Sequence, residues 1–481
     1  MLYNEPYRPQ YHFSAPQNWL NDPNGLVYYE GEYHLFYQHN PNDIMWGPMY
    51  WGHAVSPDLL HWENLPIALE PDGLGTIFSG CCIVDRNDTS GLFNGGSGLI
   101  AYYTAHLDRG EKHCLETQCM AYSRDRGRTW IKYSGNPIIQ PPGTPDDYDF
   151  RDPKVVWDEE SQQWIMALGG GFIRFYGSTD LIHWKLLSET KFFEEFPDIF
   201  RLEVENEPGT QKWVLALAGF RYLIGRFENG RFIAEQPELC ADYAKGCQAA
   251  QTYANMPDGR TVWIAWMRDG SRGPTEPWRC CMSIPKELSL HRDSDGTIRL
   301  LQKPVAELDS LRSSLFSIQN TFFSAGSEIL PALSGKELDI EAEFSGLSGA
   351  KQMDLKLFVG EDQQTLIRID FESRHVFADY TGAHIPALRD KQTSFEGNYY
   401  TVPERVKLRG FCYNAPFIPG DTLKFRVLCD RSTVEFFIPG TDVVFTFCVF
   451  PTQNADSIRL SCSNDCIVTE LNVYKMRSVW Q

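Results

Sequence analysis

Three acidic residues in the first half of the chain lie in sequence contexts that could support catalysis. Asp22 lies in WLNDPNG, Asp152 in YDFRDPKVVW and Glu195 in KFFEEFPDIF, so each is close to a proline and to aromatic residues. A single carboxylate in such a stretch is most often a turn or capping residue. Three of them in comparable proline-containing turns, expected in three separate structural units, indicate a shared site.

Converging carboxylates allow two kinds of chemistry. One is metal binding, which favours additional oxygen ligands at close spacing. The other is cleavage of a glycosidic bond, which needs one ionised carboxylate and one protonated acid on either side of the anomeric carbon. The neighbouring residues favour the second, because flat rings can cover the C–H faces of a sugar while polar side chains bind its hydroxyl groups. The rings are those of Trp19, Phe36, Trp46, Trp51 and Phe78, and the polar side chains are those of Asn21, Gln38, Ser79 and Arg151.

Glu195 is the candidate for the protonated acid. Phenylalanines flank it at positions 192, 193 and 196, and the other carboxylates are expected nearby. Apolar surroundings and like charges both raise the pKa of a carboxyl group. We therefore expect the pKa of Glu195 to be raised, as a general acid at neutral pH requires.

The stretch from Asn21 to Gly25 has the composition of a turn, and an alternating strand pattern follows it. Trp19 and Leu20 precede it, although a plain exposed turn would not need them. Two interpretations remain open from this stretch alone. It is either a hairpin loop covered by an indole, or a turn that directs Asp22 into a pocket with apolar walls.

The elements that would position these residues are mostly short strands. Before residue 310 the chain consists of short alternating or apolar runs separated by turn residues, which is typical of an all-β domain. A weak repeat of Ser-x-Asp followed by Trp occurs at 56–62 (SPDLLHW), 123–130 (SRDRGRTW) and 178–184 (STDLIHW). Repeats of this length with several strands each predict propeller blades, about five in number.

A change of pattern near residues 302–335 divides the chain. We expect a five-bladed β-propeller over residues 1–302, a linker with a short helix over 303–335, and a β-sandwich over 336–481. The linker is expected to be helical because QKPVAELDSLRSSLFSIQN is the best amphipathic segment of the chain. After it, regular period-2 strands joined by turns predict the sandwich. The candidate carboxylates lie in the first half, so we assign the chemistry to the propeller.

Composition excludes some classes of function. The formal charge of −19 over 481 residues argues against nucleic-acid partners and against anionic membrane surfaces. The 13 cysteines include the adjacent pairs Cys81–Cys82 and Cys280–Cys281, which suit neither a disulfide framework nor a zinc site. Free thiols and the lack of an apolar leader region predict a cytoplasmic location.

Six motifs occur in an order that resembles glycoside hydrolase family 32, the group of invertases, levanases and inulinases. They are WLNDPNG (19–25), FYQHNP (36–41), MYWGHAVSPDLLHW (49–62), IFSG (77–80), FRDPKV (150–155) and EFPD (195–198). DRSTVEFFIPG in the second half is similar to the accessory domain of the family. The resemblance covers nearly the whole chain and implies a five-bladed propeller with a C-terminal sandwich.

The resemblance also implies residue roles. Asp22 would be the nucleophile, Glu195 the acid/base, and Asp152 the residue that holds fructose hydroxyls and stabilises the transition state. The fructose subsite would be lined by Asn21, Gln38, Trp46, Phe78, Ser79 and Arg151. No metal or organic cofactor is implied. A retaining mechanism requires the two catalytic carboxyl groups to lie about 5–5.5 Å apart.

The sequence departs from the family pattern at several positions. Phe196 replaces a cysteine after the acid/base residue, and Glu194 next to Glu195 leaves room for an assignment shifted by one. Gln248 stands where a tyrosine is common. The region 244–276 carries polar groups such as Arg268, Asp269 and Arg272 in place of aromatic residues. These differences are either neutral loop changes or signs of altered leaving-group recognition.

The function that we expect is retaining hydrolysis of terminal β-fructofuranosyl residues from sucrose, fructo-oligosaccharides or a related small fructoside. The partner is then a small fructose-containing saccharide, and a cytoplasmic location would exclude polymeric fructans as natural substrates. One alternative is a fructosyltransferase, or an enzyme that forms or opens difructose dianhydrides, through the same covalent intermediate. A non-catalytic fructan-binding protein and a metal-dependent propeller are further alternatives. The sequence does not indicate the oligomeric state.

Overall fold

The computed structural model describes residues 3–110, 114–143, 149–244, 246–330, 333–380, 382–383, 412–417 and 420–480, apart from the side chains of residues 272, 412 and 413. Strands dominate this part of the chain, and its two helices are short 3-10 turns, η1 (Arg268–Arg272) and η2 (Ala306–Leu311). No helix among the described residues has the length and apolar character needed to cross a membrane.

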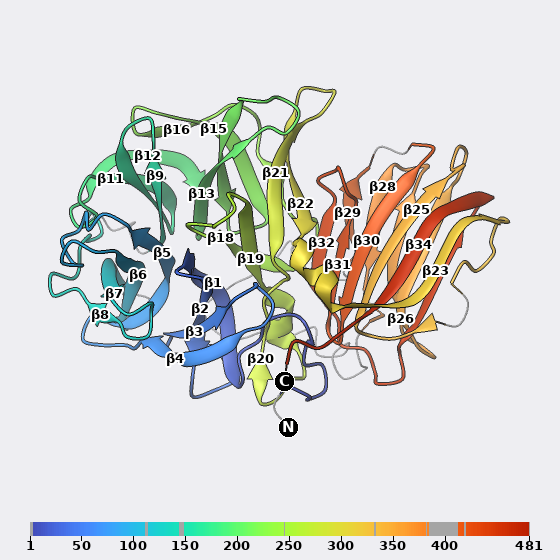
Figure 1. Ribbon diagram of the computed structural model, residues 1–481, viewed down its shortest axis with the longest axis horizontal. Coiled ribbons are helices and arrows are strands. Elements are labelled where there is room, and N and C mark those ends of the chain that lie inside the picture. The colour runs from blue at the N-terminus through green and yellow to red at the C-terminus, as the bar shows by residue number, and fades with distance from the viewer. Residues whose placement is uncertain are drawn as a thin grey trace.

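Five sheets in the described part of the chain form the blades of a propeller around a common axis (Figure 1). Blade 1 contains β1 (Asn18–Tyr29), β2 (Glu32–Asn40), β3 (Tyr50–Ser56) and β4 (Glu63–Leu69), with β20 (Trp278–Arg279) beside β1. Blade 2 contains β5 (Thr76–Asp85), β6 (Gly98–Asp108), β7 (Cys114–Ser123) and β8 (Ile131–Lys132). Blade 3 contains β9 (Arg151–Asp158), β10 (Gln163–Gly169), β11 (Phe172–Ser178) and β12 (Lys185–Phe193).

Two further blades complete the ring. Blade 4 contains β13 (Pro197–Glu203), β14 (Gln211–Leu217), β15 (Arg221–Glu228) and β16 (Arg231–Ala234), and β17 (Leu239–Cys240) also pairs with β15. Blade 5 contains β18 (Cys247–Thr252), β19 (Thr261–Met267), β21 (Lys286–Arg292) and β22 (Ile298–Pro304). The prediction of a five-bladed propeller is confirmed.

The sequence repeat forms the connection between the third and fourth strands of blades 1 to 3. In each copy the aspartate accepts a backbone N–H from a residue three or four positions later, at 2.8–2.9 Å. The aspartates are Asp58, Asp125 and Asp180. The repeat therefore marks a turn held by an aspartate side chain, which is the usual use of aspartate in turns.

The first and last blades are joined directly. β20 pairs in parallel with β1, so that Asn18 lies opposite Trp278. Farther along β1, Tyr28 donates its N–H to the Ala254 carbonyl at 3.0 Å. These contacts connect the start of the ring to its end and fix β1, the innermost of the four main strands of blade 1.

Two six-stranded sheets pack against each other as a β-sandwich (Figure 1, right). The first contains β23 (Arg312–Phe323), β34 (Cys466–Met476), β25 (Leu338–Ser345), β30 (Leu423–Asp430), β31 (Thr433–Phe437) and β32 (Val444–Cys448). The second contains β24 (Leu333–Ser334), β33 (Ser457–Cys462), β26 (Gln352–Val359), β27 (Thr365–Asp370), β28 (His375–Asp379) and β29 (Cys412–Pro416). Inward-facing side chains such as Ile340, Leu355 and Phe436 form one apolar core between the sheets. The prediction of an all-β fold with a C-terminal sandwich is confirmed.

The described part of the expected linker over 303–335 contains a long strand. Its helix is the six-residue 3-10 helix η2, and β23 follows at once and pairs with β34 from Arg312 to Phe323. Phe316 and Ile318 alternate towards the core, but Leu315 and Phe322 are exposed apolar residues that obscure this period of two. An outer strand with apolar residues on both faces resembles an amphipathic helix in sequence.

Propeller and sandwich share a buried network of charges. The His12 side chain lies 3.0 Å from Asp430 and 3.2 Å from Glu435, and Glu435 also pairs with Lys286 at 2.8 Å. Burial opposes the charge on His12, but the hydrogen bonds to both carboxylates outweigh it and raise the pKa of His12 to about 9. Apolar contacts between the two domains surround this network.

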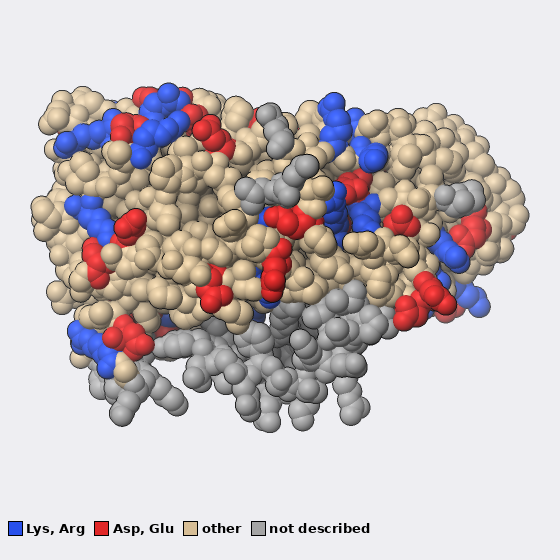
Figure 2. Space-filling model, turned by 90° about the horizontal axis from the view of Figure 1, so that it is seen from below, with Lys and Arg blue, Asp and Glu red and all other residues tan. Residues whose placement is uncertain are grey.

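Surface charges of opposite sign lie side by side on the face shown in Figure 2. In the described chain, Arg128 pairs with Glu32, and Arg226 pairs with Glu228 and Glu235. Exposed pairs of this kind each contribute little stability.

The expected lack of nucleic-acid and membrane partners stays a prediction. The described cysteine side chains are all free thiols.

Candidate active site

A pocket that opens to solvent lies at the centre of the propeller and is lined by residues from blades 1, 2, 3 and 5 and from the segment between β12 and β13. All nine site residues predicted from the sequence line it, and five further residues join them. The predicted residues are Asn21, Asp22, Gln38, Trp46, Phe78, Ser79, Arg151, Asp152 and Glu195, and the additional ones are Phe196, Gln248, Ala249, Trp266 and Arg268. Trp19, Phe36 and Trp51, which the sequence also offered as sugar-binding rings, are buried in the cores instead.

The stretch from Asn21 to Gly25 belongs to β1 and is not a turn. It stays paired with β2, with two shifts of register on the way. Gly25 has φ +56°, and a Cβ at this position would lie 2.6 Å from a ring carbon of Phe36. Pro, Asn and Gly suit a bulged strand as well as a turn, which explains the wrong prediction. The bulged backbone brings Asp22 to the wall of the pocket.

Trp19 has a structural role beneath this strand. Its indole N–H donates to the Asn21 side-chain oxygen at 2.7 Å, and its ring packs edge-on against Trp266. The buried indole therefore holds Asn21, the neighbour of Asp22, in one orientation. This combines the two interpretations left open by the sequence, because the indole covers the strand and the carboxylate faces the pocket.

Asp22 is a partly buried carboxylate with one strong side-chain donor. The Ser79 hydroxyl donates to Asp22 Oδ2 at 2.8 Å. Burial, together with the charge of Glu195, raises the pKa of Asp22 to about 6, although the hydrogen bonds from Ser79 and Asn21 act in the opposite direction. Asp22, from β1, and Glu195, from the segment just before β13, both line the pocket.

Asp152 is held in an uncommon backbone conformation. It is the second residue of β9 and has φ +64°. Its N–H donates to Thr104 Oγ1 at 3.1 Å, and its Oδ2 accepts the N–H of Phe196 at 3.1 Å. Phe196 itself has φ +50°. A non-glycine residue with a positive φ is strained, and the surrounding structure must hold it in place. Such residues are found preferentially at functional sites.

The electrostatics of Asp152 follow from its position among charges. Burial raises its pKa well above the ordinary range, and Glu195 and Asp22 add to this effect, whereas Arg151 opposes it. The carboxyl group of Asp152 is therefore protonated more readily than an exposed aspartate.

Arg151 is one of two arginines that line the pocket, and it faces four carboxylates. Its guanidinium donates to Glu195 Oε2 at 3.0 Å and to Asp149 Oδ1 at 2.5 Å. It also lies 3.4 Å from Glu116 and 3.7 Å from Asp152. The planar fork of arginine suits such multiple contacts, so Arg151 both offsets the negative charge and fixes the carboxylates relative to one another.

Glu195 lines the pocket just before β13 and is partly exposed. Gln248 Nε2 donates to Glu195 Oε1 at 3.1 Å, so that both carboxylate oxygens have a partner. Its neighbour Glu194 pairs instead with Arg221 and does not line the pocket. The geometry therefore favours Glu195 over the assignment shifted by one residue. The sequence had marked Gln248 only as a departure at the rim.

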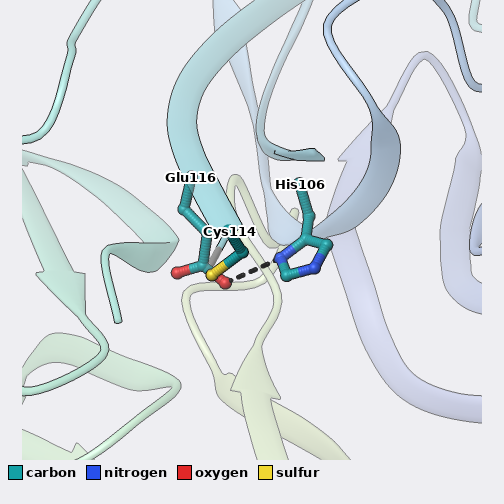
Figure 3. Close-up of side chains that lie close together, drawn as sticks. All are labelled: His106, Cys114 and Glu116. Carbon is teal, nitrogen blue, oxygen red and sulfur yellow. Dashed lines mark hydrogen bonds and ion pairs between the residues drawn. The ribbon is translucent and has the colours of Figure 1, made fainter. Parts of the chain in front are cut away.

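His106, Cys114 and Glu116 lie close together (Figure 3), next to the pocket residues Phe78 and Arg151. His106, Cys114 and Glu116 place their potential ligand atoms within 4.8 Å of one another, so the trio could hold a metal ion. Glu116 already accepts hydrogen bonds from His106 at 3.0 Å and from the Phe150 N–H at 2.6 Å. His106 stacks on the pocket ring of Phe78 at 4.1 Å. Phe78 is thus linked to Arg151 through the stacked His106 ring and the Glu116 carboxylate.

Two family models and several known proteins are similar to this chain over nearly its whole length. The model of the glycosyl hydrolases family 32 N-terminal domain matches residues 12–304, and that of the family 32 C-terminal domain matches residues 307–475. A levanase of Bacillus subtilis (strain 168) is 38% identical, over 99% of this chain and 72% of the levanase. An extracellular exo-inulinase of Aspergillus niger is 32% identical, over 99% of this chain and 96% of the inulinase. The crystal structure of an exo-inulinase from Aspergillus awamori superposes with a TM-score of 0.88 at 30% identity, covering 100% of both chains.

Proposed function

The chain belongs to glycosyl hydrolases family 32, and on this premise we propose that it removes terminal β-fructofuranosyl residues from sucrose and fructans with retention of configuration. Relatives named levanase and exo-inulinase support a glycosidase that acts on fructosides. The observation that carries the proposal is the single pocket lined by Asp22, Asp152 and Glu195.

The reaction takes two displacements. In the first, an Asp22 carboxylate oxygen attacks the anomeric carbon of the terminal fructosyl unit, the bond from this carbon to the leaving oxygen breaks, and Glu195 gives its proton to that oxygen. In the second, ionised Glu195 takes a proton from water while the water oxygen attacks the same carbon and the bond to Asp22 breaks. Each step inverts the anomeric carbon, so the product retains the original configuration.

Other residues of the pocket position the sugar and stabilise charge. Asp152, fixed by Phe196 and Thr104, is assigned to the hydroxyl groups of the terminal fructose and to the positive charge that develops in the transition state. Arg151 and Gln248 hold the two oxygens of Glu195, so that its carboxyl group is oriented before substrate binds. Asn21, Gln38, Trp46, Phe78 and Ser79 are assigned to the remaining wall of the fructose subsite.

The test is a panel of fructosides with chromatography of the products. We expect release of fructose from sucrose and fructo-oligosaccharides by the wild type, and a loss of at least about a thousandfold in kcat for Asp22→Asn with binding retained. Reaction in aqueous methanol should yield the methyl β-fructofuranoside, because a retaining enzyme transfers the sugar with net retention. A methyl α-fructofuranoside, or full activity of Asp22→Asn, would refute the mechanism.

The same experiment addresses fructosyl transfer. Gln248 and Arg268 place polar groups in the pocket, where they could orient a sugar hydroxyl as acceptor instead of water. Products longer than the substrate at high sucrose concentration would support transfer, and free fructose alone would support hydrolysis. A metal-dependent reaction would lose activity in excess chelator, whereas the proposed mechanism retains it.

A further inference from the structure

Two phenylalanine rings on blade 3 are exposed to solvent. The side chains of Phe172 and Phe193 are 45% and 65% exposed. They face each other across β11 and β12 as a register pair, and their rings pack edge to face with centroids 5.6 Å apart. Exposed aromatic groups contribute little to a core, and an exposed apolar patch can mark a binding surface.

The pair is tied to the segment that carries the proposed acid/base. Phe193 is the last residue of β12, two positions before Glu195. The backbone of Glu194 makes two hydrogen bonds to the β10–β11 hairpin, from the Gly170 N–H at 3.1 Å and to the Gly171 carbonyl at 2.9 Å. The position of the rings relative to Glu195 is therefore set by backbone contacts and not by flexible side chains.

The pair also borders the charged wall of the site. A Cβ built at Gly171 would lie 3.7 Å from the Phe193 ring and 3.6 Å from the Asp149 carbonyl oxygen. Asp149 in turn bonds to Arg151, the cation that holds Glu195. The aromatic surface thus begins where the wall of the pocket ends, on the side of the residue that protonates the leaving group.

We propose that Phe172 and Phe193 form a binding platform for the sugar units of the leaving group in an oligosaccharide. This inference rests on the proposed function. The terminal fructosyl unit occupies the pocket, so the rest of the substrate must leave it past Glu195, whose proton goes to the leaving oxygen. Flat rings there can cover the apolar C–H face of a sugar, and the Arg221–Glu194 ion pair close by offers partners for its hydroxyl groups.

A disaccharide and a longer chain should therefore respond differently to loss of the rings. Sucrose has a single sugar beyond the bond that breaks, whereas a fructo-oligosaccharide of four or more units reaches farther across blade 3. We expect Phe193→Ala and Phe172→Ala to lower kcat/KM for the longer substrate by about three- to tenfold, mainly through KM. The kcat/KM for sucrose should stay within about twofold of the wild-type value.

Two variants serve as controls. Leu186→Ala removes an apolar side chain that is 48% exposed, at the end of β12 opposite Phe193. It should leave kcat/KM unchanged for both substrates. Phe193→Tyr keeps a flat ring and should retain the preference for long substrates. Thermal unfolding of every variant identifies a loss of fold.

The outcomes separate the inference from the function on which it rests. A wild type that releases fructose from none of the substrates refutes the proposed function itself. If the wild type is active, the inference is refuted when Phe193→Ala lowers kcat/KM equally for sucrose and for long substrates. It is also refuted when Phe193→Ala lowers kcat/KM for neither substrate. A fall confined to the long substrate in both alanine variants, absent in Leu186→Ala, supports it.

Discussion

Asp22 must be ionised to act as a nucleophile, and its surroundings make the pH at which this happens measurable. Burial and the charge of Glu195 raise its pKa to about 6, while the Ser79 hydroxyl stabilises the ionised form. We therefore expect kcat/KM to fall below about pH 6, as Asp22 takes up a proton. Because the carboxylates of the pocket interact, the pH profile of kcat/KM reports their combined titration and not that of Asp22 alone.

Removal of Ser79 should shift this profile. In Ser79→Ala the ionised Asp22 loses a hydrogen bond worth roughly 1 kcal/mol, so the acidic limb should move to higher pH by about half to one pH unit. The measurement is kcat/KM for sucrose between pH 4 and 8 in both proteins. A limb that stays in place, or moves to lower pH, would show that Ser79 does not stabilise the ionised carboxylate.

The same carboxylate should destabilise the folded protein at neutral pH. Its pKa is about 6 in the folded chain against 3.8 ordinarily, so the stability that it contributes is full below pH 3.8 and is lost as the pH rises through 6. Asp22→Asn removes this loss, and we expect it to be more stable than the wild type by roughly 2–3 kcal/mol at pH 8. Thermal unfolding at pH 8 and at pH 4 should show a difference that shrinks in acid. A variant less stable than the wild type at pH 8 would contradict this.

The residues that line the pocket were largely predictable, because the motifs around Asp22, Asp152 and Glu195 are short and specific, whereas their catalytic roles stay a prediction. The partners of these residues were not. Gln248 contacts Glu195 only because blade 5 lies next to blade 4 in the closed ring. No local pattern contains that information. The sequence signal for Gln248 was its replacement of a common tyrosine, which marks a position without giving its contact.

Among the elements, the glycine run at the end of β10 fixes the segment before β13. Gly170 has φ +72°, and a Cβ there would lie 2.6 Å from the Asp149 carbonyl carbon. We expect Gly170→Ala to lower the stability by about 1–3 kcal/mol and to reduce kcat, because the backbone that bonds Glu194 must shift. Thermal unfolding and kcat for sucrose measure the two effects.

Gly209→Ala is the matched control for this substitution. Gly209 has φ +83°, but a Cβ there would meet no atom within 4 Å. It should therefore show the strain of a positive φ without the clash, and kcat should be unchanged. If both variants lose stability equally and retain kcat, the close approach at Gly170 has no role in positioning Glu195.

Element type was predicted well and element boundaries less well. Two segments were misassigned, Asn21–Gly25 as a turn and the region of β23 as a linker. In both, the residues were compatible with two local structures, and pairing with another strand decided between them. Asn21–Gly25 pairs with β2, the next strand along the chain, whereas β23 pairs with β34, almost at the end of the chain. Strand pairing of this kind overrides local preference.

At the scale of the whole molecule, the buried charges around His12 make domain association sensitive to alkali. The pKa of His12 is about 9 in the folded chain, so its contribution is full below pH 6.5 and is lost as the pH rises through 9. His12→Gln should be less stable than the wild type by about 3 kcal/mol or more at pH 6, since it leaves buried carboxylates without their cation. Unfolding in denaturant at pH 6 and pH 10 should show this difference shrinking in alkali. A constant difference would mean that the charge of His12 is unimportant.

The overall architecture followed from the sequence because blade repeats and alternating strands are local patterns that recur many times. How the two domains pack did not, because His12, Lys286 and Glu435 lie in unrelated segments and none is part of a motif. The cytoplasmic location also stays a prediction. Some relatives are described as extracellular, and free thiols in the described chain are compatible with more than one compartment.

Closure of the ring by distant strands has a consequence for how the polypeptide is made on the ribosome. The edge of β1 at Asn18 has no strand partner until Trp278 has been synthesised. The Gln10 N–H likewise cannot donate to Asp430 until that residue has been synthesised. At about 5–20 residues per second, the growing chain spends tens of seconds with these edges open. Chaperones that shield nascent strands should therefore raise the yield of this protein more than that of one whose blades close in order of synthesis.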